Sequence, residues 1–167
     1  MDSAVMETLL LARSLTASVT PLRTDCGRAC GHACCLPDET GKGGMLLFPG
    51  EEALYKGKPG FTVTADHALG VPTPLLTCRG ACRREERPLS CRIFPLLPKM
   101  RDGRVRVVRD HRGFEVCPLL PDGLGAFRPE FVEAVRTAGE ALYRVEEHRL
   151  FLDRLHGLIA GFKLMNH

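Results

Sequence analysis

Cysteine is the residue type in this chain whose number and spacing point most directly to chemistry. All eight cysteines of the 167 residues lie between positions 26 and 117. They form two groups in the sequence, the first of Cys26, Cys30, Cys34 and Cys35 and the second of Cys78, Cys82, Cys91 and Cys117. The spacing CxxxC recurs, and residues four apart share one face of a helical turn, so their thiolates can converge on a metal. We therefore take all eight as candidate metal ligands, first Cys26, Cys30, Cys34, Cys82 and Cys91, then Cys78, Cys117 and Cys35.

The cellular compartment decides whether such cysteines are interpreted as metal ligands or as disulfides. The N-terminal segment carries Asp2 and Glu7 where a secretory signal peptide has Lys or Arg, and no small-residue cleavage site closes its short apolar run cleanly. No stretch approaches the ~18 apolar residues that a membrane span needs. We expect a cytoplasmic protein without a membrane segment, whose thiols stay reduced. Metal binding is then favoured over a disulfide framework and over scattered buried cysteines.

The spacing of the cysteines also bears on which metal is expected. Structural zinc sites hold their sulfurs at ~2.3 Å from one ion and commonly use a tight CxxC pair, which this chain lacks. An iron–sulfur cluster is wider and tolerates varied spacings, and Cys117 is followed by proline, as is one ligand of bacterial ferredoxins. We expect an iron–sulfur cluster of the 4Fe–4S type, with zinc as the alternative. His32 and His111 are candidate additional ligands.

Cys34 and Cys35 raise a separate question because they are adjacent, and neighbouring side chains diverge on a helix or a strand. One of them is expected to bind the metal, and the other to serve a second centre, a redox role or packing. The sequence leaves open which residue does which. A disulfide between them is the least favoured interpretation, because adjacent residues rarely reach disulfide geometry without strain.

Residues 79–112 form a basic segment, with eleven Arg and Lys residues against four acidic ones. Three interpretations stay open: a solvated face, a nucleic-acid contact, and compensation of the negative charge of a thiolate-bound cluster. For the third, Arg87 and Arg92 are the best placed as neighbours of the cofactor, because they flank Pro88 and Cys91. Nucleic acid is not the favoured partner, since aromatic side chains that stack on bases are nearly absent here. A protein partner is also open.

The N-terminal segment is the first element that hydrophobic periodicity predicts. Residues 3–17 fit an amphipathic helix with Val5 and Leu9 on its apolar face and Asp2 or Ser3 as its cap. Short elements follow: a strand over residues 44–48, a helix over 49–57 and a strand over 61–65.

The C-terminal half of the chain adds a hairpin and helices. The dipeptide Asp102–Gly103 between two strand-like runs predicts a β-hairpin with Val105 and Val107 on one face. Pro129 suits a first helical position, and the residues after it carry a continuous apolar stripe at helical spacing.

These elements predict an α+β fold with a small, irregular, cysteine-rich centre that includes a β-hairpin. The centre is flanked by an N-terminal helix and a C-terminal helical tail. We expect a single domain over residues 1–167, with the N-terminal helix in residues 1–20, the metal- or cluster-binding core in 21–121 and the C-terminal helices in 128–163.

The segments "CGRACGHACC" and "CRREERPLSCRIFP" together resemble the CxxCxxCC family of zinc- or iron-chelating proteins, the YkgJ-like group. The family's pattern is a cysteine group ending in CC, then an intermediate cysteine and RPxxCRxFP. The residues that match are Cys26, Cys30, Cys34, Cys35, Cys82, Arg87, Pro88, Cys91, Arg92, Phe94 and Pro95. The chain departs from the family in having three residues rather than two between its early cysteines.

The resemblance covers residues 26–95 and implies binding of zinc or an iron–sulfur cluster. Flagellin lysine methylases resemble this family in their cysteine motif. By analogy, the resemblance also implies a cluster-dependent methyltransferase as a possible function. No Gly-rich nucleotide-binding fingerprint follows a strand in this chain, which counts against that activity. Whether the protein is an enzyme stays open.

Overall fold

The computed structural model of the chain describes residues 2–24, 26–36, 43–80 and 82–165, without the side chains of residues 29 and 162–165. Its α-helices are α1 (Ser3–Leu15), α2 (Gly27–Cys30), α3 (Leu89–Ile93), α4 (Pro129–Leu142) and α5 (Glu146–Met165). Its strands are β1 (Met45–Leu46), β2 (Phe61–Asp66), β3 (Thr73–Cys78), β4 (Leu96–Arg101) and β5 (Arg104–Arg109). Short 3-10 helices are η1 (Ala33–Cys35), η2 (Glu51–Leu54), η3 (Arg84–Glu86), η4 (His111–Gly113) and η5 (Leu124–Ala126). Helices combined with two small antiparallel sheets confirm the predicted α+β class.

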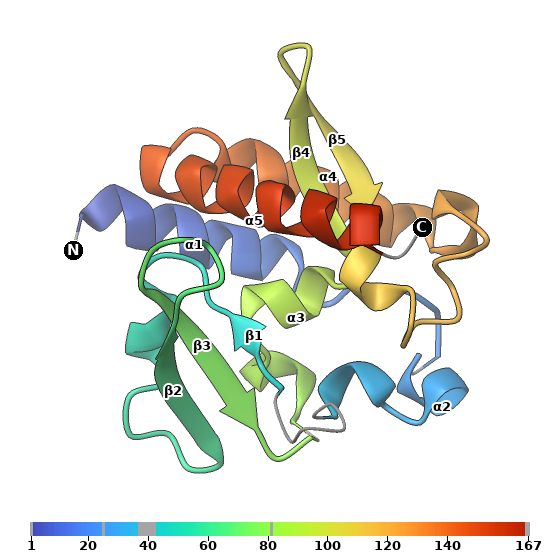
Figure 1. The fold of residues 1–167 in the computed structure, drawn as a ribbon, viewed down its shortest axis with the longest axis horizontal. Helices are drawn as coiled ribbons and strands as arrows, with labels where there is room; N and C mark the ends of the chain where they lie inside the picture. Colours follow the sequence, from blue (N-terminus) through green and yellow to red (C-terminus); the bar gives the residue numbers. More distant parts are fainter. Residues whose placement is uncertain (1, 25, 37–42, 81, 166–167) are drawn as a thin grey trace.

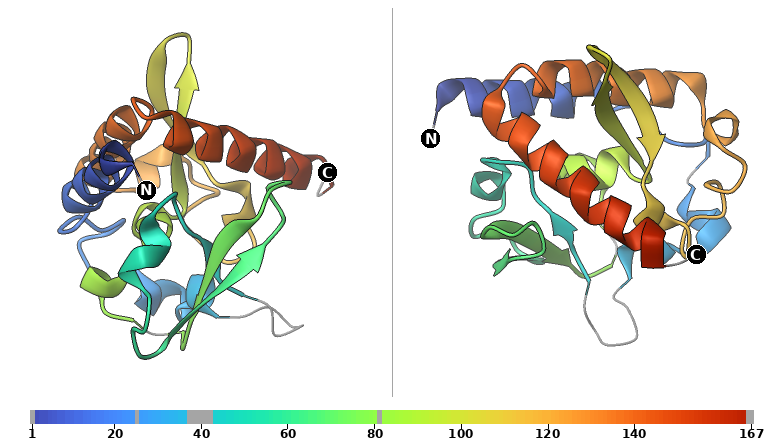
Figure 2. Two further views of the ribbon diagram at one scale, coloured as in Figure 1. Left: turned by 90° about the vertical axis from the view of Figure 1, so that its left-hand side faces the viewer. Right: turned by 45° about the horizontal axis from the view of Figure 1, so that its top comes forward.

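The three long helices lie on one side of the molecule, and the sheet of β1, β3 and β2 lies on the other (Figure 1). The short helix α3 lies between them, and the C-terminal end of β3 points towards the region of α2. The hairpin β4–β5 projects from the helical side, as Figure 2 shows from two further directions. The cysteine-bearing segments α2, β3 and α3 are therefore on the side opposite to the tip of the hairpin.

Helix α1 forms where the sequence predicts it. The Asp2 carboxylate accepts a hydrogen bond from the backbone N–H of Ala4 at 3.0 Å, which caps the first turn. Val5 and Leu9 are buried, and this face of the helix packs against α4. The predicted cap and apolar face are both confirmed.

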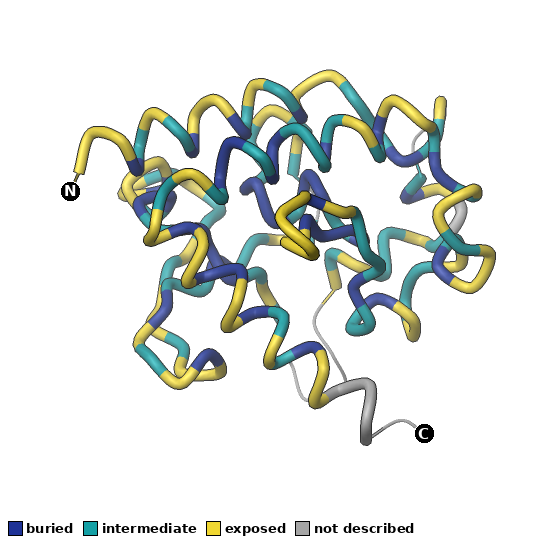
Figure 3. Tube along the Cα trace, turned by 90° about the horizontal axis from the view of Figure 1, so that it is seen from above, coloured by how far each residue is buried: buried dark blue, intermediate teal, exposed yellow. Residues whose placement is uncertain are grey.

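Helices α4 and α5 bury one face each, so buried and exposed positions alternate along them (Figure 3). Pro129 begins α4 as predicted, because a helix leaves the first N–H groups without partners and proline has none to lose. Phe131 and Val135 of α4 share one core with Leu152 of α5 and Leu9 of α1. The same core includes Leu89 and Ile93, so it packs the three long helices against α3.

The three-stranded sheet differs in detail from the prediction. Strand β3 was not predicted, yet it is the central strand and pairs antiparallel with both β1 and β2. The strand expected over residues 44–48 is confined to Met45–Leu46, since Pro49 and the left-handed Gly50 (φ 83°) redirect the chain there. The helix expected over 49–57 is the short η2.

The β4–β5 hairpin is confirmed at the predicted dipeptide. Asp102 (φ 51°) and Gly103 (φ 71°) both take positive φ, as a two-residue type I′ turn requires. The hairpin packs on α4 through Pro98, which contacts Gly139. The contact is so close that a Cβ atom on Gly139 would lie 2.2 Å from the Cβ of Pro98. Val105 is buried at this contact.

Candidate functional site

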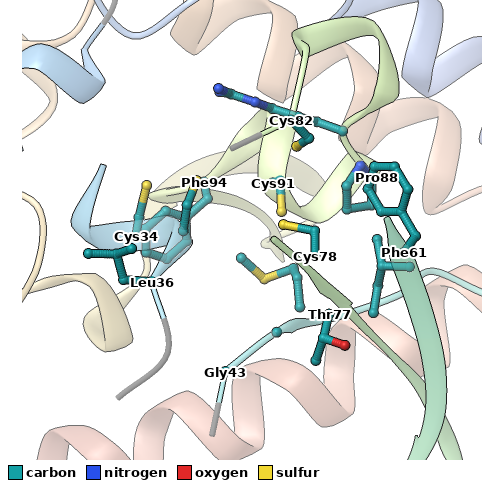
Figure 4. A pocket seen from close by; sticks show the side chains of 15 residues that line it. Cys34, Leu36, Gly43, Phe61, Thr77, Cys78, Cys82, Pro88, Cys91 and Phe94 are labelled. Atoms are coloured by element: carbon teal, nitrogen blue, oxygen red, sulfur yellow. The ribbon is translucent and has the colours of Figure 1, made fainter. Parts of the chain in front are cut away.

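Thiols from both sequence groups line one cavity of about 370 Å³. They are Cys34 and Cys35 of η1, Cys78 at the end of β3, Cys82 a few residues later, and Cys91 of α3. The sulfur atoms of Cys78 and Cys91 point towards each other in the cavity (Figure 4). The fold thus brings together thiols that are more than fifty residues apart in the chain.

Cys91 owes its position to the apolar face of α3. Leu89 and Ile93 are four residues apart on this helix and are both buried in the core. Cys91 lies midway between them, so its side chain leaves the helix on the opposite face, where it lines the cavity. The Ser90 hydroxyl donates a hydrogen bond to the carbonyl oxygen of Leu46 at 2.6 Å, which attaches α3 to β1.

Cys78 is placed by the register of the sheet. It is the last residue of β3 and lies opposite Phe61, which also lines the cavity. The chain then turns at Gly80, where φ is 83°. A Cβ atom on Gly80 would lie 3.6 Å from the carbonyl oxygen of Cys35, so this turn brings the end of β3 against η1.

A buried carboxylate fixes the start of α3. Glu51 is fully buried, and one oxygen of its carboxylate pairs with Arg13 of α1 and accepts the backbone N–H of Leu89 at 2.7 Å. Its other oxygen accepts the backbone N–H of Phe48 at 3.4 Å. Burial raises the pKa of Glu51, while Arg13 and the two N–H groups oppose this shift. The network links α1, η2 and α3 immediately behind Cys91.

Arg92 was expected beside the thiols, but its guanidinium lies elsewhere. It donates to three backbone carbonyl oxygens, those of Arg13 at 2.8 Å, Glu85 at 2.9 Å and Arg87 at 3.0 Å. Since Arg92 is 6% exposed and does not line the cavity, its observed contacts hold α3 to α1 and to the segment before α3.

Arg87, by contrast, lies at the cavity, where it was expected. Burial disfavours its charge, but the neighbouring Cys35 and Cys82 thiolates outweigh this effect and raise the pKa of Arg87. The same guanidinium partly opposes the increase in the pKa of Cys82, which arises from burial and then from Cys78. Among the described residues that line the cavity, Arg87 is the one with a cationic side chain.

The cavity thiols form an electrostatically connected set. Burial raises the pKa of Cys91, and Cys35, Cys82 and Cys78 raise it further as negative neighbours. The Cys91 thiolate is therefore disfavoured in this cavity. A bound metal reverses the effect, because coordination deprotonates a thiol.

The remaining thiols are associated with one another. Cys34 interacts first with Cys35 and then, through space, with Cys30 and Cys26, and these interactions with burial raise the pKa of Cys34. The pKa of Cys117 is raised by burial and also by Cys30. Cys26, Cys30 and Cys117 do not line the cavity. The spatial grouping therefore differs from the grouping in the sequence. Cys35 lies with Cys78, Cys82 and Cys91, whereas Cys117 is nearer to Cys30.

Within the described residues, no three His, Cys, Asp or Glu side chains are arranged to hold a single metal ion. All eight cysteines lie in the described part of the chain, and none of them is in a disulfide. The candidate histidines do not line the cavity. The ring of His32 covers Gly27, where a Cβ atom would lie 2.2 Å from Nδ1, and the ring of His111 stacks on Phe114 with 5.0 Å between centroids.

Comparisons of the chain with protein-family models, with curated proteins and with solved structures found no match. The resemblance to the CxxCxxCC family therefore stays a prediction from the motif. Among the helices in the described part of the chain, none is long and apolar enough to span a membrane.

Apolar side chains complete the cavity wall, and sequence reasoning did not assign them to the site. They include Met45 of β1, Phe61 of β2, and Leu36 and Phe94 from the segments beside η1 and α3. The strands that carry Met45 and Phe61 were predicted in part. Their contact with the cysteines depends on β3, the strand that the sequence pattern did not indicate.

Proposed function

We propose that the protein binds an iron–sulfur cluster in this cavity through the thiolates of Cys35, Cys78, Cys82 and Cys91. The observation that carries the proposal is that thiols from three separate segments surround one cavity of about 370 Å³. In a cluster each thiolate binds a different iron atom, so the four sulfurs stand farther apart than around one ion. The thiols are spread around the cavity, which suits an iron–sulfur cluster better than a single ion.

The electrostatics of the site supports this proposal. Burial and the neighbouring thiols raise the pKa values of Cys82 and Cys91, so metal binding to these two residues should release protons. A cluster bound by four thiolates keeps a net negative charge, which the Arg87 guanidinium would offset. The apolar wall, with Phe61 and Phe94, would limit access of water to the cluster.

Zinc is the second candidate, favoured by the other thiol group. Cys26, Cys30, Cys34 and Cys117 form a second set of four thiols, which is the ligand number of a structural zinc site. The resemblance to a zinc- or iron-chelating family agrees with either metal.

Metal analysis of two matched variants tests the proposal. The protein is purified anaerobically, and iron, acid-labile sulfide and zinc are measured together with the visible spectrum. We expect a brown protein with about four iron and four sulfide per chain, lost in Cys91→Ser and retained in Cys117→Ser. A colourless protein with stoichiometric zinc, lost in Cys117→Ser and retained in Cys91→Ser, would contradict the cluster. It would support the zinc site instead. Absence of both metals after anaerobic reconstitution would overturn both.

A further inference from the structure

The β4–β5 hairpin carries four cations on one face. Lys99 lies directly opposite Arg106, and Arg101 lies directly opposite Arg104. Alternate residues of a strand share a face, so both pairs are on the same side of the hairpin. All four side chains are exposed, and none forms a salt bridge within the described residues.

This register is electrostatically unfavourable in the isolated protein. Like charges directly opposite each other across two strands destabilise a sheet. Packing does not impose this choice, because the apolar contact with α4 is made by the other face, through Pro98 and Val105. Two successive cationic pairs on a free face are instead suited to a ligand with closely spaced negative charges.

A groove extends the cationic face onto α4. Arg104 and Arg106 line one side of a depression of about 520 Å³. Its other side is lined by Arg136 and Glu140 of α4 and by Arg144, which lies just beyond the end of α4. Arg136 is paired with Glu133 and Glu140. Arg144 is exposed and forms no salt bridge within the described residues, so it adds an available positive charge.

The shape of the hairpin favours a double-stranded ligand. Its tip projects from the helical side of the molecule (Figures 1 and 2), and the major groove of B-DNA admits a two-stranded β-ribbon. Residues 96–109 contain no aromatic side chain that could stack on the unpaired bases of a single strand. Double-stranded RNA fits less well, because its major groove is deep and narrow.

We propose that the cationic face of the β4–β5 hairpin, together with the groove it forms with α4, binds the phosphate backbone of duplex DNA. The contacts are electrostatic and independent of base sequence. This site is distinct from the thiol cavity and does not require that the cavity hold a metal.

Fluorescence anisotropy with a labelled 20-base-pair DNA duplex of mixed sequence, from about 50 to 200 mM salt, tests the proposal. The Arg104→Gln/Arg106→Gln variant should bind on the order of 50-fold more weakly at 0.1 M salt, with the slope of log K against log salt reduced by about two. Arg144→Gln should reduce the slope by about one. The matched control Lys56→Gln/Arg154→Gln removes two exposed charges away from the hairpin and should bind as the wild type does.

Folding and ligand class are checked in the same samples. Because Arg104→Gln/Arg106→Gln relieves two like-charge pairs, its thermal midpoint should equal or exceed that of the wild type. The proposal is overturned if the wild type shows no salt-dependent binding, or if the control loses as much affinity as the hairpin variant. It is also overturned if a duplex RNA of the same length binds as tightly as the DNA.

Discussion

The backbone N–H of Leu89 donates a hydrogen bond to the carboxylate of Glu51 at 2.7 Å, and this carboxylate is fully buried. Leu89 is the first residue of α3, and Cys91 follows two positions later. Glu51 also pairs with Arg13 of α1. One buried carboxylate thus determines where the helix that carries a cavity thiol begins.

Glu51→Ala should therefore destabilise the protein strongly. It leaves the partly buried Arg13 guanidinium and the Leu89 N–H without the carboxylate. Breaking a buried ion pair costs about 3–5 kcal/mol of unfolding free energy. Urea denaturation of the reduced protein measures the change. Glu85→Ala removes a carboxylate from an exposed pair with Arg83 and should have little effect. Equal losses in the two variants would contradict the assigned role of Glu51.

Arg92→Lys should destabilise the protein although it keeps the positive charge. A lysine cannot reproduce the three-way contact of the guanidinium with the carbonyl oxygens of Arg13, Glu85 and Arg87. Losing one or two charge-assisted hydrogen bonds should cost about 2–4 kcal/mol of unfolding free energy. The matched control is Arg79→Lys, an exposed arginine. Wild-type stability in Arg92→Lys would show that charge alone suffices at this position.

His148 should make stability depend on pH. It is fully buried, its Nε2 donates to the carbonyl oxygen of Val5 at 2.9 Å, and its Nδ1 has no hydrogen-bond partner within the described residues. Burial lowers the pKa of His148, against the opposing effects of the Val5 carbonyl and Glu147. The unfolded chain then binds more protons, so this contribution is complete above pH ~6.5 and is lost as the pH falls through the lowered pKa.

Unfolding free energies measured between about pH 7.5 and 4.5 check this dependence. Each unit by which the pKa of His148 is lowered corresponds to about 1.4 kcal/mol lost at the acid end. His148→Gln removes the titrating group and should give a shallower decline than the wild type. His67→Gln, at an exposed histidine, should keep the wild-type slope. An unchanged slope in His148→Gln would exclude the buried ring as its source.

Two glycine substitutions should have opposite effects on stability. A Cβ atom on Gly139 would lie 2.2 Å from the Cβ of Pro98, so Gly139→Ala must push α4 away from β4 and should cost about 1–3 kcal/mol. A Cβ atom on Gly157 of α5 would meet no atom within 4 Å. Gly157→Ala should therefore stabilise the protein by about 0.5–1 kcal/mol through helix propensity alone. Thermal unfolding compares both with the wild type, and stabilisation in both would contradict the close packing of α4 on β4.

The elements that the sequence predicts well are those with a local cause. The Asp102–Gly103 dipeptide specifies its turn through two positive φ angles, and Asp2 caps α1 through a contact two residues away. Strand β3 has no such signal. Its sequence, TPLLTC, contains a proline and does not alternate cleanly, and it becomes a strand because β1 and β2 pair with it on both sides.

The candidate site could be predicted in composition but not in arrangement. The cysteines were candidates by type and spacing, yet Cys35 faces the thiols of the second sequence group, while Cys34 also interacts with Cys30 and Cys26. Both residues are in η1, and the direction in which this short helix runs determines which thiols each of them faces. Arg92 was misplaced for a similar reason, because its carbonyl partner on Arg13 is 79 positions away in the chain.

Arg13 serves α3 twice, since its side chain pairs with Glu51 and its carbonyl oxygen receives Arg92. A truncated fragment that starts just before the first cysteine would keep every thiol and lose both of these attachments. Its α3 would keep its contacts with Leu46 and Glu51 but lose its attachment to α1, so Cys91 would be held less firmly. The shortest fragment able to reproduce the properties of the cavity must therefore include α1, although that helix contains no cysteine.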